Sequence, residues 1–266
     1  MSHAKEDTSR AELAWDEAAL GYDAYFGPRF APFLAATLGA LIGRSSELPS
    51  PGCIVVPCVG PGRELGPLAH AFSERQIVAS DLSGEMVKLA RARNARFPNL
   101  SVEQDDATKL RAPAQPVAGL FSAFGLQLLP DPPAALESWL RLIEPGGVAS
   151  VMFWPRESDV NGPFDVMRRL LAESSLLDHG WELRLTATAQ AASARVRADV
   201  RVRFEMQHDD ARSLWQALTR LGPLRGLALA RGEAFVDELG ARFEAELPAG
   251  AMSHTPEARL LVIERT

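Results

Sequence analysis

Residues 53–62 read CIVVPCVGPG, and this stretch decides the fold. The apolar run at 54–56 is short and continuous, which is typical of a strand buried on both faces of a parallel sheet. Gly60 and Gly62 follow directly, and a helical pattern begins at about Arg63. A strand, a glycine-rich turn and the start of a helix, in this order, let backbone N–H groups approach an anion or a polar cofactor.

The same alternation continues toward the C-terminus. Strand and helix patterns follow one another at short, regular spacing, which predicts an α/β fold with a doubly wound, mostly parallel sheet. The expected strands are 77–79, 100–103, 117–123 and 148–154, and the expected helices are 63–72, one capped by Ser83, and 133–143.

The two ends of the chain differ from this core. Residues 1–45 are expected to form an N-terminal helical cap, with helices at 11–24 and 32–42 and an aromatic turn at 25–28 between them. The remaining residues, 46–266, are assigned to one cofactor-binding domain, in which 155–190 would be a lid-like insertion.

In the last third, apolar side chains fall on every second position from Val196 to Met206, and arginines and acids fill most of the gaps. This alternation predicts a strand with one solvated face near a sheet edge. A final strand is expected at 260–263, and the two late strands are expected to pair as an antiparallel addition to the parallel sheet. Further helices are expected at 164–177, 210–221 and 233–246.

Bulk composition excludes several classes of protein. The 266 residues are 47% hydrophobic and 23% charged with a net charge of −6, which argues against the basic surface of a general nucleic-acid binder. No apolar run approaches the roughly 20 residues that span a bilayer, and no signal-peptide pattern is present, so we expect a cytoplasmic protein. Cys53 and Cys58 are the only cysteines, and we interpret them as small buried residues that hold no metal.

Asp81 stands at the end of the second expected strand, about 20 residues past the glycines. A carboxylate at this place can accept hydrogen bonds from both ribose hydroxyls of a nucleoside cofactor. Capping of the next helix is the structural alternative for Asp81, but Ser83 is better placed for that role. The glycine-rich turn could be purely structural when taken alone, whereas the turn and Asp81 together predict an adenosine-containing cofactor.

The spacing of the glycines bears on which cofactor that is. Gly60, Gly62 and Gly66 give G-x-G-x-x-x-G, one residue longer than the G-x-G-x-x-G of a nicotinamide site. The sequence also has no Tyr-x-x-x-Lys pair for a proton relay. An NAD(P)-dependent oxidoreductase stays open as an alternative on this evidence.

Five segments in the core keep a common order, namely Val59–Glu64, Ser80–Met86, Asp105–Ala107, Phe124–Asp131 and Glu144–Gly147. Taken together, across residues 54–154, they resemble the class I S-adenosylmethionine (SAM)-dependent methyltransferases, in the small-molecule branch similar to the ubiquinone/menaquinone-pathway (type 11/25) enzymes. The resemblance implies a Rossmann-like, mostly parallel seven-stranded sheet with an antiparallel C-terminal hairpin. It also implies methyl transfer from SAM to an O, N or C nucleophile by direct displacement.

The resemblance further implies roles for individual residues. Residues are assigned in this way to three parts of SAM, namely its methionine end, its adenosine and its sulfonium. The implied contacts are Gly60, Pro61 and Gly62 for the methionine end; Asp81, Leu82, Met86, Asp106 and Ala107 for the adenosine; and Ser122, Phe124 and, from the cap, Tyr22 for the surroundings of the sulfonium. Met86 and Phe124 could equally be ordinary core residues.

The chain departs from the family at the end of the first strand. The family usually carries an acid there that helps to orient the methionine end of SAM, and this chain has Val56 or Pro57. Its first glycine is replaced by Cys58 or Val59, depending on the alignment. A degenerate, non-catalytic protein of the SAM-binding fold, acting as a binding or scaffold subunit, therefore also stays open.

No catalytic base stands out in the sequence. His179 and His208 are candidates because they fall in the C-terminal third, where the family builds its acceptor site, and Tyr22 is a candidate from the cap. The insertion at 155–190 would then cover the acceptor. We expect a small-molecule methyl acceptor, no nucleic acid, membrane or metal, and a monomer or homodimer.

Overall fold

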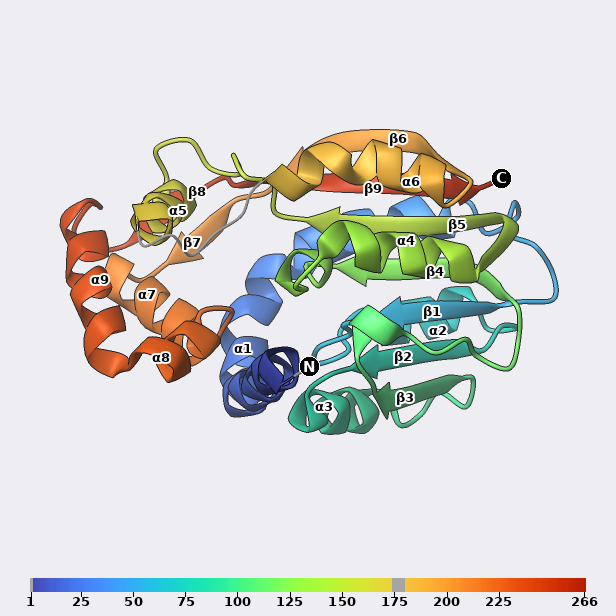
Figure 1. Cartoon of the computed structure of the whole chain (residues 1–266), viewed down its shortest axis with the longest axis horizontal. Helices are drawn as coiled ribbons and strands as arrows, with labels where there is room; N and C mark the ends of the chain where they lie inside the picture. The colour runs from blue at the N-terminus through green and yellow to red at the C-terminus, as the bar shows by residue number, and fades with distance from the viewer. Residues whose placement is uncertain (1, 174–179) are drawn as a thin grey trace. The chain divides into compact units, whose positions relative to one another are not determined.

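The computed structural model describes residues 2–173 and 180–266. Two compact units interleave along the chain. The first, here called the sheet unit, comprises 32–155, 179–202 and 258–266, and the second, the helical unit, comprises 1–31, 156–178 and 203–257. Figure 1 labels the elements of both units.

Seven strands form the main sheet, in the order β3-β2-β1-β4-β5-β9-β6. Neighbouring strands from β3 to β5 pair in parallel, whereas β9 runs antiparallel to β5. The predicted α/β fold with a mostly parallel sheet is therefore confirmed. The strand bounds are β1 Cys53–Pro57, β2 Ile77–Asp81, β3 Leu100–Gln104, β4 Val117–Ala123, β5 Ile143–Phe153, β6 Ala194–Arg203 and β9 Glu257–Arg265.

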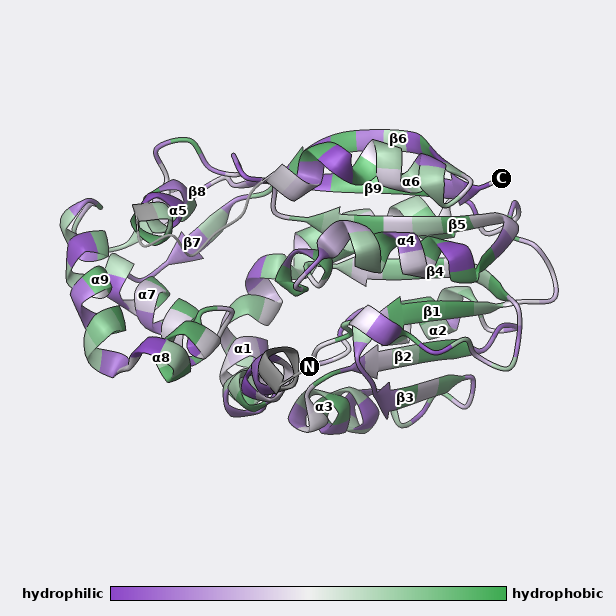
Figure 2. Ribbon diagram, in the orientation of Figure 1, coloured by the Kyte–Doolittle hydropathy of each residue, from purple (hydrophilic) through white to green (hydrophobic). Residues whose placement is uncertain are grey.

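The two late strands β6 and β9 are neighbours in this sheet, as expected from the alternating pattern. Ion pairs join Arg195 to Glu264 and Asp199 to Arg259, so residue numbers rise along one strand as they fall along the other. The two strands are thus antiparallel. Figure 2 shows β6 in mixed hydrophilic and hydrophobic colours, as expected of a strand with one solvated face, while β1 is largely hydrophobic.

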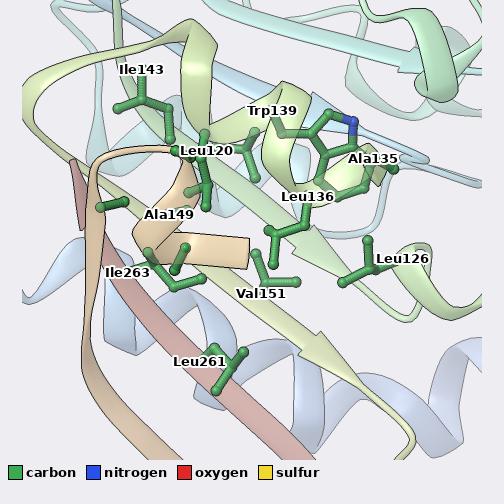
Figure 3. Close-up of a cluster of buried hydrophobic side chains, with 14 of the residues drawn as sticks. Leu120, Leu126, Ala135, Leu136, Trp139, Ile143, Ala149, Val151, Leu261 and Ile263 are labelled. Carbon is green, nitrogen blue, oxygen red and sulfur yellow. The ribbon is translucent and has the colours of Figure 1, made fainter. Parts of the chain in front are cut away.

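Two hydrophobic clusters form the core of the sheet unit. Along β4, Leu120 belongs to one cluster and Phe121 to the other, because successive side chains of a strand point to opposite faces. Figure 3 shows the first cluster, where Trp139 and Leu136 lie beside strand residues such as Val151. The helices that belong to this unit are α2 Leu65–Ala71, α3 Gly84–Asn94, α4 Pro132–Leu142 and α6 Leu185–Ala191.

Strand β1 is the point at which the strand order reverses, since β2 and β3 lie on one side of it and β4 and β5 on the other. In open α/β sheets, ligands bind outside the carboxyl ends of the strands at such a point. The glycine-rich turn leaves β1 at this end. The topology therefore predicts a ligand site at the turn and at the tips of β2 and β4.

Helix α1, Ser2–Ile42, is continuous, so the predicted break at 25–28 is wrong. Pro28 lacks the N–H that a helix interior uses, yet aromatic side chains four residues apart stack along the helix. Ring centroids lie 5.3 Å apart for Tyr22 and Phe26, and 5.4 Å apart for Phe26 and Phe30. This packing offsets the missing hydrogen bond.

The alternating stretch at 196–206 is also not one strand. Strand β6 ends at Arg203, and β7, Met206–His208, pairs instead with β8, Met252–His254, in a separate two-stranded sheet of the helical unit. The alternation continues across the break, and Met206 is 1% exposed, whereas the apolar side chains of β6 after Ala194 are only partly buried and Val200 is exposed. Periodicity alone could not show that the partner strand changes.

The helical unit also contains α5 Pro163–Glu173, α7 Ala211–Arg220, α8 Arg225–Arg231 and α9 Glu233–Ala245. Of these, α5, α7 and α9 fall where helices were expected, whereas α8 and, in the sheet unit, α6 were not predicted. The role of 155–190 as a lid stays a prediction. Within the described residues, no helix combines the length and apolar character needed to cross a membrane.

Candidate functional site

The glycine-rich turn after β1 has a strained backbone that approaches its neighbours closely. Cys58, Gly60 and Gly62 have positive φ angles of 54°, 53° and 68°, a conformation that glycine adopts without steric cost. A Cβ at Gly62 would lie 2.8 Å from the Cβ of Ala90, so α3 packs directly against the turn. A Cβ at Gly60 would meet nothing within 4 Å, which leaves the space beside that backbone open.

Asp81 ends β2, and its carboxylate lies against this turn. Its Oδ2 accepts a hydrogen bond from the Gly60 amide at 2.8 Å, and its Oδ1 accepts one from the Ser83 amide at 3.0 Å. Ser83 caps α3 by accepting from the Met86 amide at 3.1 Å, as the sequence predicted. These two hydrogen bonds from backbone amides hold the Asp81 carboxylate beside the turn, where it is only partly buried.

The tip of β3 brings two further acids beside β2. The Asp105 amide donates to the Asp81 carbonyl at 3.0 Å, so the two strand ends are joined. Asp106 follows, and its Oδ1 accepts from the amide and the hydroxyl of Thr108 at 2.9 and 2.7 Å. Both acids are partly exposed, and the Asp105 carboxylate also pairs with Arg111. Asp106 thus has a local capping role besides the adenine contact that the resemblance implies.

The tip of β4 adds a buried hydroxyl and an aromatic cluster. Ser122 is fully buried, and its Oγ has no hydrogen-bond partner among the described residues. Buried polar atoms in native proteins rarely lack a partner, so this hydroxyl suits a ligand atom. Phe124 has a positive φ of 61° and stacks on Trp154 with ring centroids 4.5 Å apart. Phe33 packs edge-on against both rings.

This cluster lies close to the glycine-rich turn. A Cβ at Gly125 would lie 2.4 Å from the Cβ of Cys58 and 3.4 Å from the Ser122 hydroxyl. The tips of β1 and β4 therefore approach one another at the switch point. Burial, together with the charges of Asp81 and Asp106, raises the pKa of the Cys58 thiol, so these acids lie near it as well.

Of the remaining residues proposed to contact the adenosine, Met86 and Ala107 are buried and Leu82 is partly exposed. The Ala107 carbonyl accepts a hydrogen bond from the Trp139 indole at 2.8 Å, which ties this turn to the core. The Leu82 carbonyl accepts a hydrogen bond from the side-chain Nε2 of Gln104 at 2.9 Å. These contacts fix the backbone between the strand tips, and whether the side chains touch a ligand stays a prediction.

Glu64 is a site residue that the sequence reasoning did not single out. It directly follows the glycine-rich turn, at the N-cap of α2, and it is only 7% exposed. The pKa of its carboxyl is raised to about 7, mainly by burial and also by the charge of Asp81, while a hydrogen bond from its own backbone and the charge of Arg93 act in the opposite direction. The sequence did carry one signal for Glu64: an acidic residue closely follows the glycines in a chain that lacks the acid the family usually has before them.

The candidate residues of the helical unit belong to a different set of contacts. Tyr22 packs edge-on against Trp15 with ring centroids 5.3 Å apart, in the aromatic row of α1. His179 lies outside the described residues. His208 is 3% exposed and belongs to a chain of four hydrogen-bonded side chains that the sequence did not predict.

This chain, here called the relay, joins Tyr25, His208, His254 and Asp159. The Tyr25 hydroxyl lies 2.8 Å from His208 Nδ1, the two Nε2 atoms of His208 and His254 lie 3.1 Å apart, and His254 Nδ1 lies 2.8 Å from Asp159 Oδ2. The Phe164 amide also donates to Asp159 Oδ2 at 3.1 Å. Because the four side chains come from separate segments, no local sequence pattern could reveal them.

One arrangement of protons satisfies every contact in the relay. Burial, the neighbouring His254 and Arg29 lower the pKa of His208 to about 3, so His208 is neutral at pH 7. Burial raises the pKa of Tyr25 to about 12, so its hydroxyl keeps its proton. Tyr25 then donates to His208 Nδ1, His208 Nε2–H donates to His254, and His254 Nδ1–H donates to Asp159. In this arrangement the Asp159 carboxylate is the final acceptor of the relay.

A metal site is not visible in the part of the chain that the structure describes. Within 2–173 and 180–266, no three His, Cys, Asp or Glu side chains are arranged to hold a metal ion. The polar groups at the strand tips are instead three acids, a hydroxyl and backbone amides, with an aromatic cluster beside them. Such a set suits an organic, cationic ligand with hydroxyl groups.

Comparison with known protein families identifies the same region. Residues 54–147 match the family described as "Methyltransferase domain". A trans-aconitate 2-methyltransferase of Azoarcus sp. (strain BH72) is 34% identical over 100 residues, which are 38% of this chain and 38% of that protein. A 2-phytyl-1,4-naphthoquinone methyltransferase of Thermosynechococcus vestitus is 29% identical over 107 residues, 40% of this chain and 48% of the relative. The matched region thus spans less than half of these relatives.

Solved structures extend the likeness in fold to most of the chain. The magnesium protoporphyrin IX methyltransferase of Synechocystis PCC 6803, with S-adenosylhomocysteine (SAH) bound, superposes with a TM-score of 0.55 at 13% identity, covering 88% of this chain and 83% of that chain. A Haemonchus contortus phosphoethanolamine N-methyltransferase complex with SAH gives a TM-score of 0.58 at 15% identity, covering 94% of this chain and 57% of that chain.

Proposed function

We propose, from the match of residues 54–147 to the family described as "Methyltransferase domain", that the protein is a class I SAM-dependent methyltransferase that transfers the methyl group of SAM to a small-molecule nucleophile. The observation that carries the proposal is the Asp81 carboxylate, held 2.8 Å from the Gly60 amide at the reversal point of the sheet. A nicotinamide-dependent activity is not favoured, because the longer glycine spacing speaks against it.

The residues at the strand tips fit SAM. Asp81 would hold the ribose hydroxyls, and Asp106, with Leu82, Met86 and Ala107, would adjoin the adenine. The open space at Gly60 leaves room for the methionine end beside the turn formed with Pro61 and Gly62, and the unpartnered Ser122 hydroxyl offers a further polar contact. When bound, SAM supplies an electrophilic methyl group attached to a sulfonium.

The chain itself contributes mainly alignment and exclusion of water. A direct displacement needs the nucleophile and the methyl group in line, and positioning can supply most of the rate gain. Phe124, Trp154 and Phe33 form an aromatic wall at the tips of β4 and β5, and aromatic faces attract cations. This wall would favour the sulfonium side of the cofactor over neutral competitors.

The catalytic base, where the acceptor requires one, is not assigned by the geometry. His208, Tyr22 and His179 are kept as predictions for this role, and both ring nitrogens of His208 are engaged in hydrogen bonds within the relay.

The acceptor is proposed to be a small organic molecule and not a nucleic acid. The relatives described above are named for trans-aconitate and for 2-phytyl-1,4-naphthoquinone, which are both small organic molecules. Whether the methylated atom is O, N or C depends on which small molecule binds in the acceptor site. A cytoplasmic location, a monomeric or homodimeric state and a pocket wall at Tyr22 are kept as predictions.

Binding and transfer assays test this function. We expect micromolar binding of SAM by calorimetry, no comparable binding of NADH, and transfer of labelled methyl from SAM to a member of a panel of phenols, carboxylates, amines and quinols. Binding of NADH in place of SAM would support the oxidoreductase alternative. Binding of neither would leave only a scaffold protein of the same fold.

A further inference from the structure

The end of β1 carries no acid in this chain. Val56 is 1% exposed and Pro57 is the last residue of the strand. The glycine-rich turn that follows must therefore hold a ligand without a carboxylate from β1. The carboxyl group that does lie buried at this turn belongs to Glu64, on its other side.

Glu64 is a buried carboxyl whose charge is only partly compensated. It is 7% exposed, and the charge of Arg93, which lowers its pKa, does not cancel the effect of burial. The Arg93 guanidinium, which favours its charged form, donates a hydrogen bond to the Pro61 carbonyl. A buried carboxylate is costly unless it is paired and hydrogen-bonded, so this site favours a positively charged ligand group.

The surroundings of Glu64 indicate what kind of cation fits. Asp81, with which it interacts unfavourably, is already held by two backbone amides and would bind the ribose of the proposed cofactor. A cation placed beside the turn would relieve the repulsion between the two acids. SAM carries two positive groups, the sulfonium and the α-ammonium of its methionine part. The aromatic wall of Phe124 and Trp154 is the group suited to the sulfonium.

We propose that Glu64 binds the α-ammonium group of the methionine part of SAM and takes the place of the acid missing from the end of β1. The inference rests on the proposed function, since it concerns the same cofactor. Glu64 is a positioning residue in this scheme: it fixes the methionine end, and it does not touch the methyl group. The carboxylate and the ammonium would form a charge-assisted hydrogen bond in a site shielded from water.

The test compares Glu64→Gln with the wild type by calorimetry, using three ligands. SAM has both cations, SAH has the ammonium alone, and 5′-methylthioadenosine has neither. We expect Glu64→Gln to weaken SAM and SAH at least tenfold and 5′-methylthioadenosine less than twofold. Glu85→Gln is the matched control, because it removes the same charge from an exposed position in the first turn of α3.

Proton release gives a second readout that does not depend on affinity alone. At pH 6 an α-ammonium is protonated, whereas burial keeps the Glu64 carboxyl, with its pKa near 7, largely neutral in the free protein. Binding of the ammonium would ionise Glu64, so SAM binding in buffers of different ionisation enthalpy should release close to one proton. The release should vanish in Glu64→Gln and persist in Glu85→Gln.

Three results would overturn the inference while leaving the proposed function intact: unchanged affinities in Glu64→Gln, an equal loss for all three ligands, or a loss for SAM without a loss for SAH. The last would place Glu64 at the sulfonium. A wild-type protein that binds none of the three ligands would instead contradict the proposed function, and the inference with it. Thermal melting of Glu64→Gln confirms that the variant is folded.

Discussion

The proposed binding of SAM depends mainly on single carboxyl groups, and these differ in how far the sequence predicts their roles. Asp81 could be predicted because a short apolar run marks β2, and the residue after such a run lies at the strand tip. Its helix-capping alternative was resolved by Ser83, which makes the capping bond. Glu64 could not be predicted, because its burial depends on how α2, α3 and the turn pack together.

The raised pKa of Glu64 predicts how the free protein responds to pH. The pKa is about 7 in the folded state against an ordinary value of 4.5, so the neutral carboxyl is compatible with folding and the charged one opposes it. The stability associated with Glu64 is fully present below pH 4.5 and is lost as the pH rises to about 7. Glu64→Gln should therefore match the wild type near pH 4.5 and exceed it by about 3 kcal/mol above pH 7.

Denaturant unfolding at a series of pH values, without ligand, measures this difference. The Glu85→Gln variant, at an exposed position, should show no comparable gain. A constant difference between Glu64→Gln and the wild type from pH 4.5 to 8 would show that the carboxyl is not buried as described.

At the scale of elements, the local sequence could not predict whether a helix continues without a break or which strands pair with one another. The break expected at Pro28 is overridden by aromatic rings stacked along α1. The alternating stretch from Val196 continues through two strands in two different sheets, because alternation reports a buried face and not a partner. The relay has the same character, since its members come from α1, β7, β8 and the segment before α5.

Helix α1 gives a prediction about stability. Pro28 is exposed within a continuous helix, where it removes one backbone hydrogen bond. Pro28→Ala restores that donor, and we expect it to raise the free energy of unfolding, by up to about 3 kcal/mol. Denaturant unfolding checks this, and a loss of stability in Pro28→Ala would indicate that the chain bends at residue 28.

The relay gives a prediction about acid stability. Because the pKa of His208 is lowered to about 3 in the folded protein, the neutral ring stabilises the fold above its ordinary pKa of 6.5, and this stability is lost as the pH falls from 6.5 toward 3. His208→Gln lacks this titration, so its melting temperature should fall less than that of the wild type between pH 7 and pH 4.5.

His70→Gln is the matched control for that measurement, because His70 is an exposed histidine on α2. It should follow the wild type across the pH range. If His208→Gln also follows the wild type, His208 is not held neutral by its surroundings.

For the whole molecule, the regular alternation of strand and helix was enough to predict the α/β sheet and the strand tips at which the candidate site lies. The order in which strands lie in a parallel sheet follows general rules of connection, so the position of the site could also be anticipated. The two interleaved units were beyond such reasoning, because each is assembled from three separate pieces of the chain. Family likeness identifies 54–147, and the function of the whole protein is argued from the site.

Calorimetric titration of SAM into Asp81→Asn is the most direct test of the central claim, that a carboxylate at the tip of β2 holds the cofactor ribose beside the glycine-rich turn. Loss of two charge-assisted hydrogen bonds should weaken SAM at least about 100-fold. Glu103→Gln, which removes the same charge from an exposed position on β3, should bind SAM like the wild type. Wild-type affinity in Asp81→Asn would contradict the account.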